Sequence, residues 1–78
     1  MPMLLRTGPY RFFFYANEGR EPAHVHVERD ENRAKFWLNA VGLAENVGFN
    51  MVELNALRKL VEANEADFQR AWDAFFGS

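Results

Sequence analysis

Hydrophobic and polar positions alternate with a period of two as far as about residue 43, and from residue 50 the apolar positions recur every three to four residues. The first period is typical of strands with one buried face and the second of amphipathic helices. The pattern predicts an α+β fold, in which an antiparallel four-stranded meander precedes two C-terminal helices packed on one sheet face. The expected strands cover residues 3–6, 10–16, 24–29 and 33–38. After them, we expect a strand extension through Leu43 and then a loop to residue 48.

Signals for helix ends divide the C-terminal part of the chain into two helices. Asn50 has the position of an N-cap, and Glu53 completes the spacing of a capping box. Asn64 repeats the cap signal, and Gly77 suits the end of the second helix. The apolar stripes should face the sheet and comprise Leu54, Leu57, Leu60, Val61, Phe68, Ala71, Trp72 and Phe75. The alternative is one continuous helix over 51–76, which at about 39 Å is too long for so small a chain unless it dimerises.

Strand alternation sorts the side chains of the predicted sheet into two faces. Val25 and Val27 should face the helices, together with Ala34, Phe36 and Leu38. The intervening positions then point away from the helices. They combine aromatic rings, cations and imidazoles, which predicts a surface that contacts a ligand or partner: Arg11, Phe13, Tyr15, His24, His26, Glu28, Arg33, Lys35 and Trp37.

Composition adds that residues 1–78 form one small domain without cysteine. Its stability must come from apolar packing, to which eight Phe, two Trp and two Tyr contribute, and a homodimer would add to it. The lack of cysteine fits the cytoplasm. The N-terminal apolar run is too short for a signal peptide, and no stretch is long enough to span a bilayer. We expect a cytoplasmic protein with no membrane contact.

The net charge of −2 is unevenly distributed. Residues 1–38 carry six basic and five acidic side chains, whereas residues 39–78 carry three and six. The first half is therefore the half suited to bind an anion such as RNA. An acidic total weakens the case for RNA and strengthens the case for a protein partner.

His24 and His26 are the two histidines of the chain and lie in the segment EPAHVHVE (21–28). In one interpretation they are polar side chains of the outer face without a chemical role. In a second they are an acid–base pair, in which one ring removes a proton from a ribose 2′-hydroxyl and the other protonates the leaving oxygen. Arg11, Tyr15 and Lys35 would then assist at the phosphate.

A third interpretation is a metal site, in which Glu28 joins His24 and His26 as a two-histidine–one-carboxylate set. Without thiolate ligands the ion would be Zn, Fe, Mn or Ni, and no other cofactor is expected. A covalent serine or cysteine mechanism is excluded, because the chain has no cysteine and its one serine, Ser78, is terminal.

Five residues are candidates for contact with a partner protein. Glu18 and Arg20 belong to the polar loop 17–22 beside the histidine strand. Phe13 and Trp37 belong to the predicted outer face, and Phe76 lies off the apolar stripe of the second helix.

Three segments resemble a small bacterial family known as domain of unknown function 4160: YRFFFYANEGREPAHVHVE (10–28), AKFWL (34–38) and GFN–x–x–EL (48–54). Together they cover nearly the whole chain, and their order is specific. The family often has proline where this chain has Ala23 and serine where it has Asn50. His24, His26 and Glu28 occupy positions of its motif, for which the resemblance implies no established mechanism.

The resemblance implies a small α+β domain, and also a partner. Members are often encoded beside a protein of another uncharacterised family, numbered 2442, and the pair has been interpreted as a type II toxin–antitoxin module with proteins like this one as the toxin. We therefore expect a toxin component that binds such an antitoxin and acts on RNA or another phosphodiester. The alternatives are a non-catalytic protein-interaction module and a small metal-binding protein.

Overall fold

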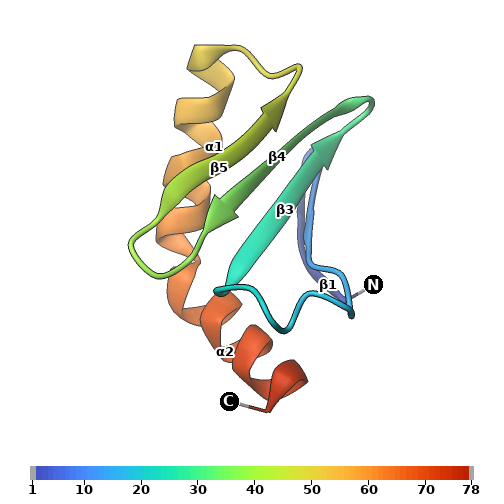
Figure 1. Ribbon diagram of the computed structural model, residues 1–78. Helices are drawn as coiled ribbons and strands as arrows, with labels where there is room; N and C mark the ends of the chain where they lie inside the picture. The colour runs from blue at the N-terminus through green and yellow to red at the C-terminus, as the bar shows by residue number, and fades with distance from the viewer. Residues whose placement is uncertain (1, 78) are drawn as a thin grey trace.

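The computed structural model describes residues 2–77 and has an α+β architecture (Figure 1). Five antiparallel strands form one meander sheet in the order β1-β2-β3-β4-β5, and two helices follow. The elements are β1 (Met3–Thr7), β2 (Tyr10–Phe13), β3 (His24–Arg29), β4 (Asn32–Trp37), β5 (Gly42–Val47), α1 (Met51–Ala63) and α2 (Glu65–Phe76). The predicted fold class is confirmed. The sheet has one strand more than predicted, and β2 ends at Phe13 rather than at residue 16.

The additional strand, β5, occupies the segment that we expected to be a strand extension and a loop. It pairs with β4, with Glu45 opposite Lys35 and Gly42 opposite Trp37. The chain reverses before β5 with Ala40 at a positive φ of 59°. β5 is an edge strand, and most of its side chains are exposed. Because β5 buries few side chains, its sequence does not alternate clearly between apolar and polar residues. The hydrophobic pattern therefore did not predict this strand.

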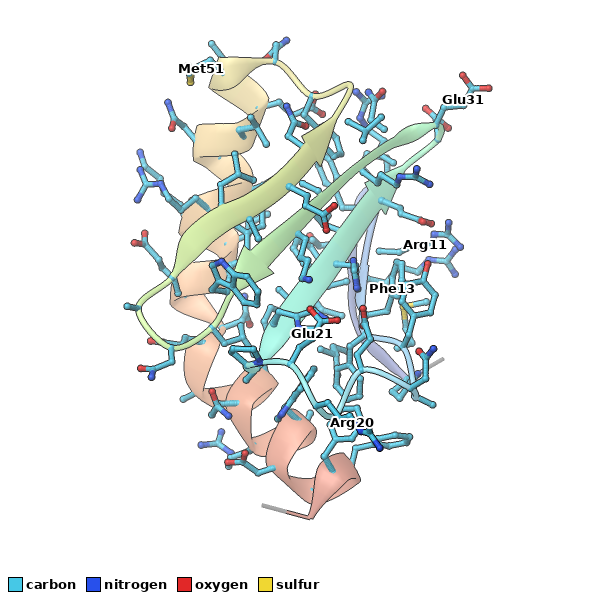
Figure 2. The ribbon with its side chains drawn as sticks, in the orientation of Figure 1. Arg11, Phe13, Arg20, Glu21, Glu31 and Met51 are labelled. Atoms are coloured by element: carbon cyan, nitrogen blue, oxygen red, sulfur yellow. The ribbon has the colours of Figure 1, made fainter. Side chains whose placement is uncertain are left out.

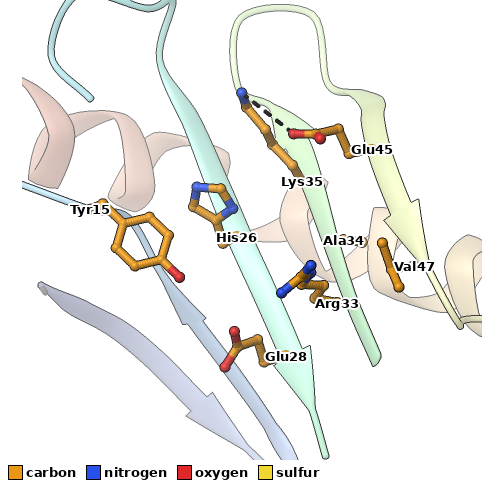
Figure 3. Close-up of a pocket in the computed structure, with 8 residues that line it drawn as sticks. All are labelled: Tyr15, His26, Glu28, Arg33, Ala34, Lys35, Glu45 and Val47. Carbon is orange, nitrogen blue, oxygen red and sulfur yellow. Dashed lines mark ion pairs between the residues drawn. The ribbon is translucent and has the colours of Figure 1, made fainter. Parts of the chain in front are cut away.

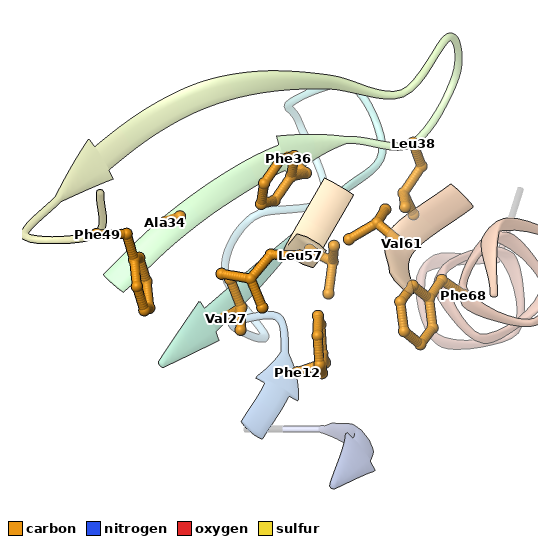
Figure 4. Packing of buried hydrophobic residues seen from close by; sticks show 10 residues of the cluster. Phe12, Val27, Ala34, Phe36, Leu38, Phe49, Leu57, Val61 and Phe68 are labelled. Carbon is orange, nitrogen blue, oxygen red and sulfur yellow. The ribbon is translucent and has the colours of Figure 1, made fainter. Parts of the chain in front are cut away.

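Both helices cover one face of the sheet, and the core lies between the two layers (Figure 4). Val25 and Val27 are fully buried on that side, as alternation predicted. They belong to one continuous cluster with residues of the sheet, the helices and the turn before α1. The other members of this cluster are Phe12, Ala34, Phe36, Leu38, Phe49, Leu57, Val61 and Phe68. Burial of these apolar side chains is the main force that holds helices and sheet together.

The helix boundaries follow the predicted signals in part. Asn50 caps α1, because its Oδ1 accepts a hydrogen bond from the backbone N–H of Glu53 at 2.9 Å. Asn64 separates the two helices, so two helices are confirmed rather than one. Its side chain does not cap α2 and instead donates to the carbonyl oxygen of Leu60 at 2.8 Å. Gly77 ends α2 in the left-handed conformation, with φ 76°.

The C-terminal part of α2 extends past the end of the sheet at which β3 begins (Figure 1). There its rings surround Phe14, whose ring centroid lies 5.1 Å from Trp72, 5.5 Å from Phe75 and 5.3 Å from Phe76. Phe75 is 49% exposed, so its predicted place in the core is wrong. No helix in residues 2–77 combines the length and the apolar character that crossing a membrane requires.

Candidate functional site

The sheet face opposite the helices, here called the open face, consists of rows of cross-strand neighbours. His26 lies opposite Phe13 on one side and Lys35 on the other, and Lys35 lies opposite Glu45. The next row is formed in the same way by Arg11, Glu28, Arg33 and Val47. Directly opposed side chains share a face. The predicted grouping on one outer face is confirmed for these positions.

A pocket on the open face contains three of the predicted catalytic residues (Figure 3). Tyr15, His26 and Lys35 contribute to its wall, and the other lining residues are Glu28, Arg33, Ala34, Glu45 and Val47. Tyr15 comes from the segment after β2, His26 from β3 and Lys35 from β4. The meander thus brings residues from distant parts of the sequence to one place.

Residues 14–23, here called the site loop, connect β2 to β3 and pass over the end of the open face at which β3 begins (Figure 2). Backbone hydrogen bonds shape this loop. The N–H of Glu18 donates to the carbonyl of Tyr15 at 3.2 Å, and the N–H of Glu21 donates to that of Glu18 at 3.1 Å. The N–H of Leu38 donates to the carbonyl of Ala23 at 3.0 Å and ties the end of the loop to β4.

His24 is the first residue of β3, and its side chain is fully buried beneath the site loop. Its Nδ1–H donates to the carbonyl oxygen of Pro22 at 2.9 Å. Its Nε2 lies 2.9 Å from Oε1 of Glu18. The ring of Trp72 in α2 also packs against the imidazole of His24, with their centroids 4.9 Å apart. His24 lies on the same side of β3 as His26, as alternation predicted, but the site loop and Trp72 enclose it. Contrary to our expectation, it is not accessible to a substrate.

His26 lies further along β3 and reaches the same carboxylate. Its Nε2–H donates to Glu18, with both carboxylate oxygens 2.9 Å away. The ring stacks on Phe13 at a centroid distance of 5.5 Å and meets Tyr15 edge-on at 5.0 Å. Its side chain is 17% exposed, so His26 is the histidine that a ligand in the pocket can touch.

Glu18 joins the two imidazoles, and we call Glu18, His24 and His26 the histidine–carboxylate cluster. Oε1 of Glu18 also accepts a hydrogen bond from the backbone N–H of Tyr15 at 2.9 Å. Burial opposes ionisation of this carboxyl group. The contacts from Tyr15, His26 and His24 outweigh that effect and lower the pKa of Glu18 below the ordinary glutamate value. The cluster therefore holds a carboxylate anion at the edge of the pocket.

One nitrogen of the cluster is left unsatisfied. Although Nε2 of His24 is close to Oε1 of Glu18, the contact does not have hydrogen-bond geometry, and this buried nitrogen has no hydrogen-bond partner among the described residues. Buried polar atoms without a partner are rare in folded proteins and call for an explanation. The imidazole of His24 therefore presents a buried ring nitrogen to the Glu18 carboxylate without a hydrogen bond between them.

The carboxylate predicted for a metal site, Glu28, is not part of this cluster. It accepts a hydrogen bond from Nη2 of Arg11 at 2.6 Å. The group of metal-ligand side chains within residues 2–77 contains Glu18 in its place. Glu28 is too far along β3 to join the histidines, because it lies opposite Arg11 and Arg33. The site loop folds back onto the histidines and brings Glu18 to them instead.

Two of the predicted catalytic cations are already paired with carboxylates. Arg11 is bound to Glu28 as described above. Nζ of Lys35 donates to Glu21 at 2.6 Å, lies 3.9 Å from Glu45 and sits 4.8 Å above the ring of Trp37. These pairs neutralise much of the positive charge that a phosphate would meet on the open face.

The predicted partner-binding residues differ in accessibility. Phe13 is only 1% exposed, because the rings of His26 and Tyr15 cover it, so it cannot contact a partner directly. Phe76 packs against Trp72 at a centroid distance of 4.4 Å. Trp37 is partly buried, Glu18 belongs to the cluster, and Arg20 is exposed on the site loop (Figure 2).

The contact of Glu18 with both histidines is the feature that sequence reasoning missed. The sequence placed Glu18 in a polar loop near the histidine strand, which made it a candidate for partner contact. The available signal was an acidic residue in the NEGREP segment directly before the histidines. Strand alternation assigns faces only to strand residues, so it favoured Glu28 over a loop residue.

Comparison with known proteins identifies one family. A family model described as "Domain of unknown function (DUF4160)" matches residues 10–73, which include the site loop, both histidines and most of the two helices. No curated protein and no solved structure matches the chain.

Proposed function

This chain belongs to the family of domain of unknown function 4160, and we propose that it is the toxin component of a two-protein toxin–antitoxin module that acts on RNA or another phosphodiester. The observation that carries the proposal is the position of His26 in the wall of the open-face pocket, with Glu18 behind it and Tyr15 and Lys35 beside it. A carboxylate-supported imidazole beside a cation and a phenol contains the groups that phosphodiester cleavage requires.

In this proposal Nδ1 of His26 accepts the proton of the attacking hydroxyl group, while its Nε2–H donates to the Glu18 carboxylate. Lys35 and Arg33 contact the phosphate, after Lys35 exchanges one of its carboxylate partners for the substrate. His24 is buried, so it cannot donate a proton to the leaving oxygen directly. In this proposal Tyr15, whose ring contacts that of His26, donates that proton.

A second candidate function is a non-catalytic module that docks a protein on the open face. The ion pairs Arg11–Glu28 and Lys35–Glu21 favour it, because they leave less positive charge for nucleic acid. The two candidates share the proposed antitoxin partner of the 2442 type and differ in whether His26 performs chemistry.

Both candidate functions can be tested by expressing the wild type and His26→Gln in bacteria. Growth curves and total RNA profiles are then compared. We expect growth arrest with RNA fragmentation for the wild type and neither for His26→Gln. Glu62→Gln is a suitable control, because Glu62 lies on the exposed surface of α1 and pairs only with Arg58 among the described residues. Arrest that persists in His26→Gln would favour docking alone, and wild-type cells that grow normally would contradict the toxin proposal.

A further inference from the structure

We propose that Glu18, His24 and His26 bind one divalent transition-metal ion. The ligand atoms are a carboxylate oxygen of Glu18 and the Nε2 atoms of the two imidazoles, all within 4.8 Å of one another. Two imidazoles and one carboxylate form a common ligand set for Zn²⁺ and Fe²⁺. This inference goes beyond the proposed function and does not depend on it, because metal binding is measured on the purified protein.

The protonation of His24 gives the first reason. A carbonyl oxygen can only accept, so the proton of a neutral His24 ring lies on Nδ1, which donates to Pro22. Nε2 then carries a lone pair that faces the Glu18 carboxylate 2.9 Å away, without a hydrogen bond. In the neutral ring these two electron-rich atoms repel each other, and either a proton on Nε2 or a cation between the two atoms removes the repulsion. A cation held by both atoms turns the repulsion into coordination and satisfies the buried nitrogen.

The hydrogen bonds behind the cluster give the second reason. Histidine ligands of metals usually donate their other ring N–H to a carbonyl or carboxylate group, which fixes the tautomer and the ring orientation. His24 makes this contact with the carbonyl of Pro22. Carboxylate ligands are themselves hydrogen-bonded in such sites, and Glu18 accepts from the backbone N–H of Tyr15.

The burial of the three side chains gives the third reason. Their exposed fractions are 0% for His24, 13% for Glu18 and 17% for His26. Imidazole ligands favour Zn²⁺ and its neighbours over Mg²⁺ or Ca²⁺, and the site contains no thiolate. Three protein ligands leave a coordination position for water. With the ion bound, Nε2 of His26 would be a ligand and its ring proton would lie on Nδ1, so a hydroxide ion on the metal would be the base in place of the imidazole.

The test is a calorimetric titration with Zn²⁺ of the protein comprising residues 1–78, after a chelator has removed any bound metal. We expect one saturable site per chain. A parallel titration with Co²⁺ should produce the visible absorption of a nitrogen- and oxygen-ligated ion, and the fluorescence of Trp37 and Trp72 should change because both rings contact His24. Absence of a saturable site, or a Co²⁺ spectrum identical to that of the hydrated ion, would overturn the proposal.

Substitutions then identify the ligands. Glu18→Gln should weaken Zn²⁺ binding by more than roughly 10–100-fold, the loss typical of a supporting residue. Glu28→Gln is the matched control, since Glu28 is a carboxylate of the same face held by Arg11, and it should leave the affinity unchanged. His26→Gln serves as a second ligand variant, and circular dichroism verifies that each variant folds. Equal affinity in the wild type and folded ligand variants, or a loss confined to Glu28→Gln, would exclude this ligand set.

Discussion

The carboxylate of Glu18 lies 2.9 Å from Nε2 of His24, which joins the site loop to the first residue of β3. This contact makes the geometry of the site depend on the path of a loop. The loop in turn is held by α2, because Gly19 lies against Phe76 and Phe14 is surrounded by rings of the helix. The aromatic packing at the end of α2 therefore determines where Glu18 meets the two imidazoles.

Substitution of Gly19 by alanine should disturb the site without touching its ligands. A Cβ atom at this position would lie 2.5 Å from Cδ1 of Phe76, whose ring is fixed between Phe14 and Trp72. Overpacking of this kind costs about 1–3 kcal/mol of unfolding free energy, which chemical denaturation would measure. The displaced loop should also weaken the contact of Glu18 with the histidines, visible as changed imidazole resonances in NMR spectra.

Gly42→Ala provides the comparison for that experiment, because the nearest atom to a new Cβ there, the Ala40 carbonyl oxygen, is 3.7 Å away. It should change the unfolding free energy by less than about 0.5 kcal/mol. If Gly19→Ala were as stable as Gly42→Ala and gave an unchanged histidine spectrum, the proposed support of the loop by α2 would be wrong.

Acid should destabilise the protein partly through Glu53. Hydrogen bonds from Arg29 and Tyr10 lower the pKa of Glu53 in the folded protein. The unfolded chain therefore takes up a proton at higher pH than the folded one, so this stabilisation is complete above the ordinary glutamate pKa of about 4.3 and is lost as the pH falls through the lowered value. Urea unfolding midpoints between pH 6 and pH 3 would measure the loss.

Glu53→Gln is the variant that isolates this contribution. It should be less stable than the wild type near neutral pH and lose less stability on acidification. Glu62→Gln, which removes an exposed carboxylate of the same helix, should keep the wild-type pH dependence. Parallel pH profiles for the wild type and Glu53→Gln would mean that another carboxyl group accounts for the acid sensitivity.

Shortening a side chain to alanine should change the unfolding free energy much more on the buried side of α1 than on its exposed side. Leu57 is fully buried between helix and sheet, and Leu57→Ala should cost about 2–5 kcal/mol of unfolding free energy. Val52 is 80% exposed on the same helix, and Val52→Ala should stay within about 0.5 kcal/mol of the wild type. Denaturant unfolding of both variants checks this, and similar losses at the two positions would contradict the packing of α1 against the sheet.

Lys35→Met should separate stability from activity on the open face. Lys35 is 8% exposed and paired with Glu21. A methionine keeps much of the volume and removes the cost of burying the ammonium group, and Glu21, which is 44% exposed, loses its partner without becoming a buried unpaired charge. We expect a melting temperature at or above that of the wild type, together with loss of the growth arrest proposed above. A stable Lys35→Met variant that still arrests growth would exclude a role for Lys35 in phosphate binding.

The sequence alone was sufficient for the features that depend on local periodicity. Alternation in β3 correctly turned Val25 and Val27 toward the helices and His26 toward the open face, but it did not foresee that Trp72 of α2 packs against His24. The cap at Asn50 and the break at Asn64 are also local, since each depends on contacts within a few residues. Such signals survive in the sequence because the strand and helix periods assign each side chain to a face without reference to the rest of the chain.

Only the tertiary structure decided which residues form the site. The burial of His24 depends on the site loop and on Trp72 of α2, and the entry of Glu18 in place of Glu28 depends on the fold of that loop. The edge strand β5 was not predicted from the sequence, because it buries few side chains and so has no clear hydrophobic alternation. The physical reason is the same in each case: a loop conformation and the docking of a distant helix follow from packing between segments, which no periodic pattern along the chain encodes.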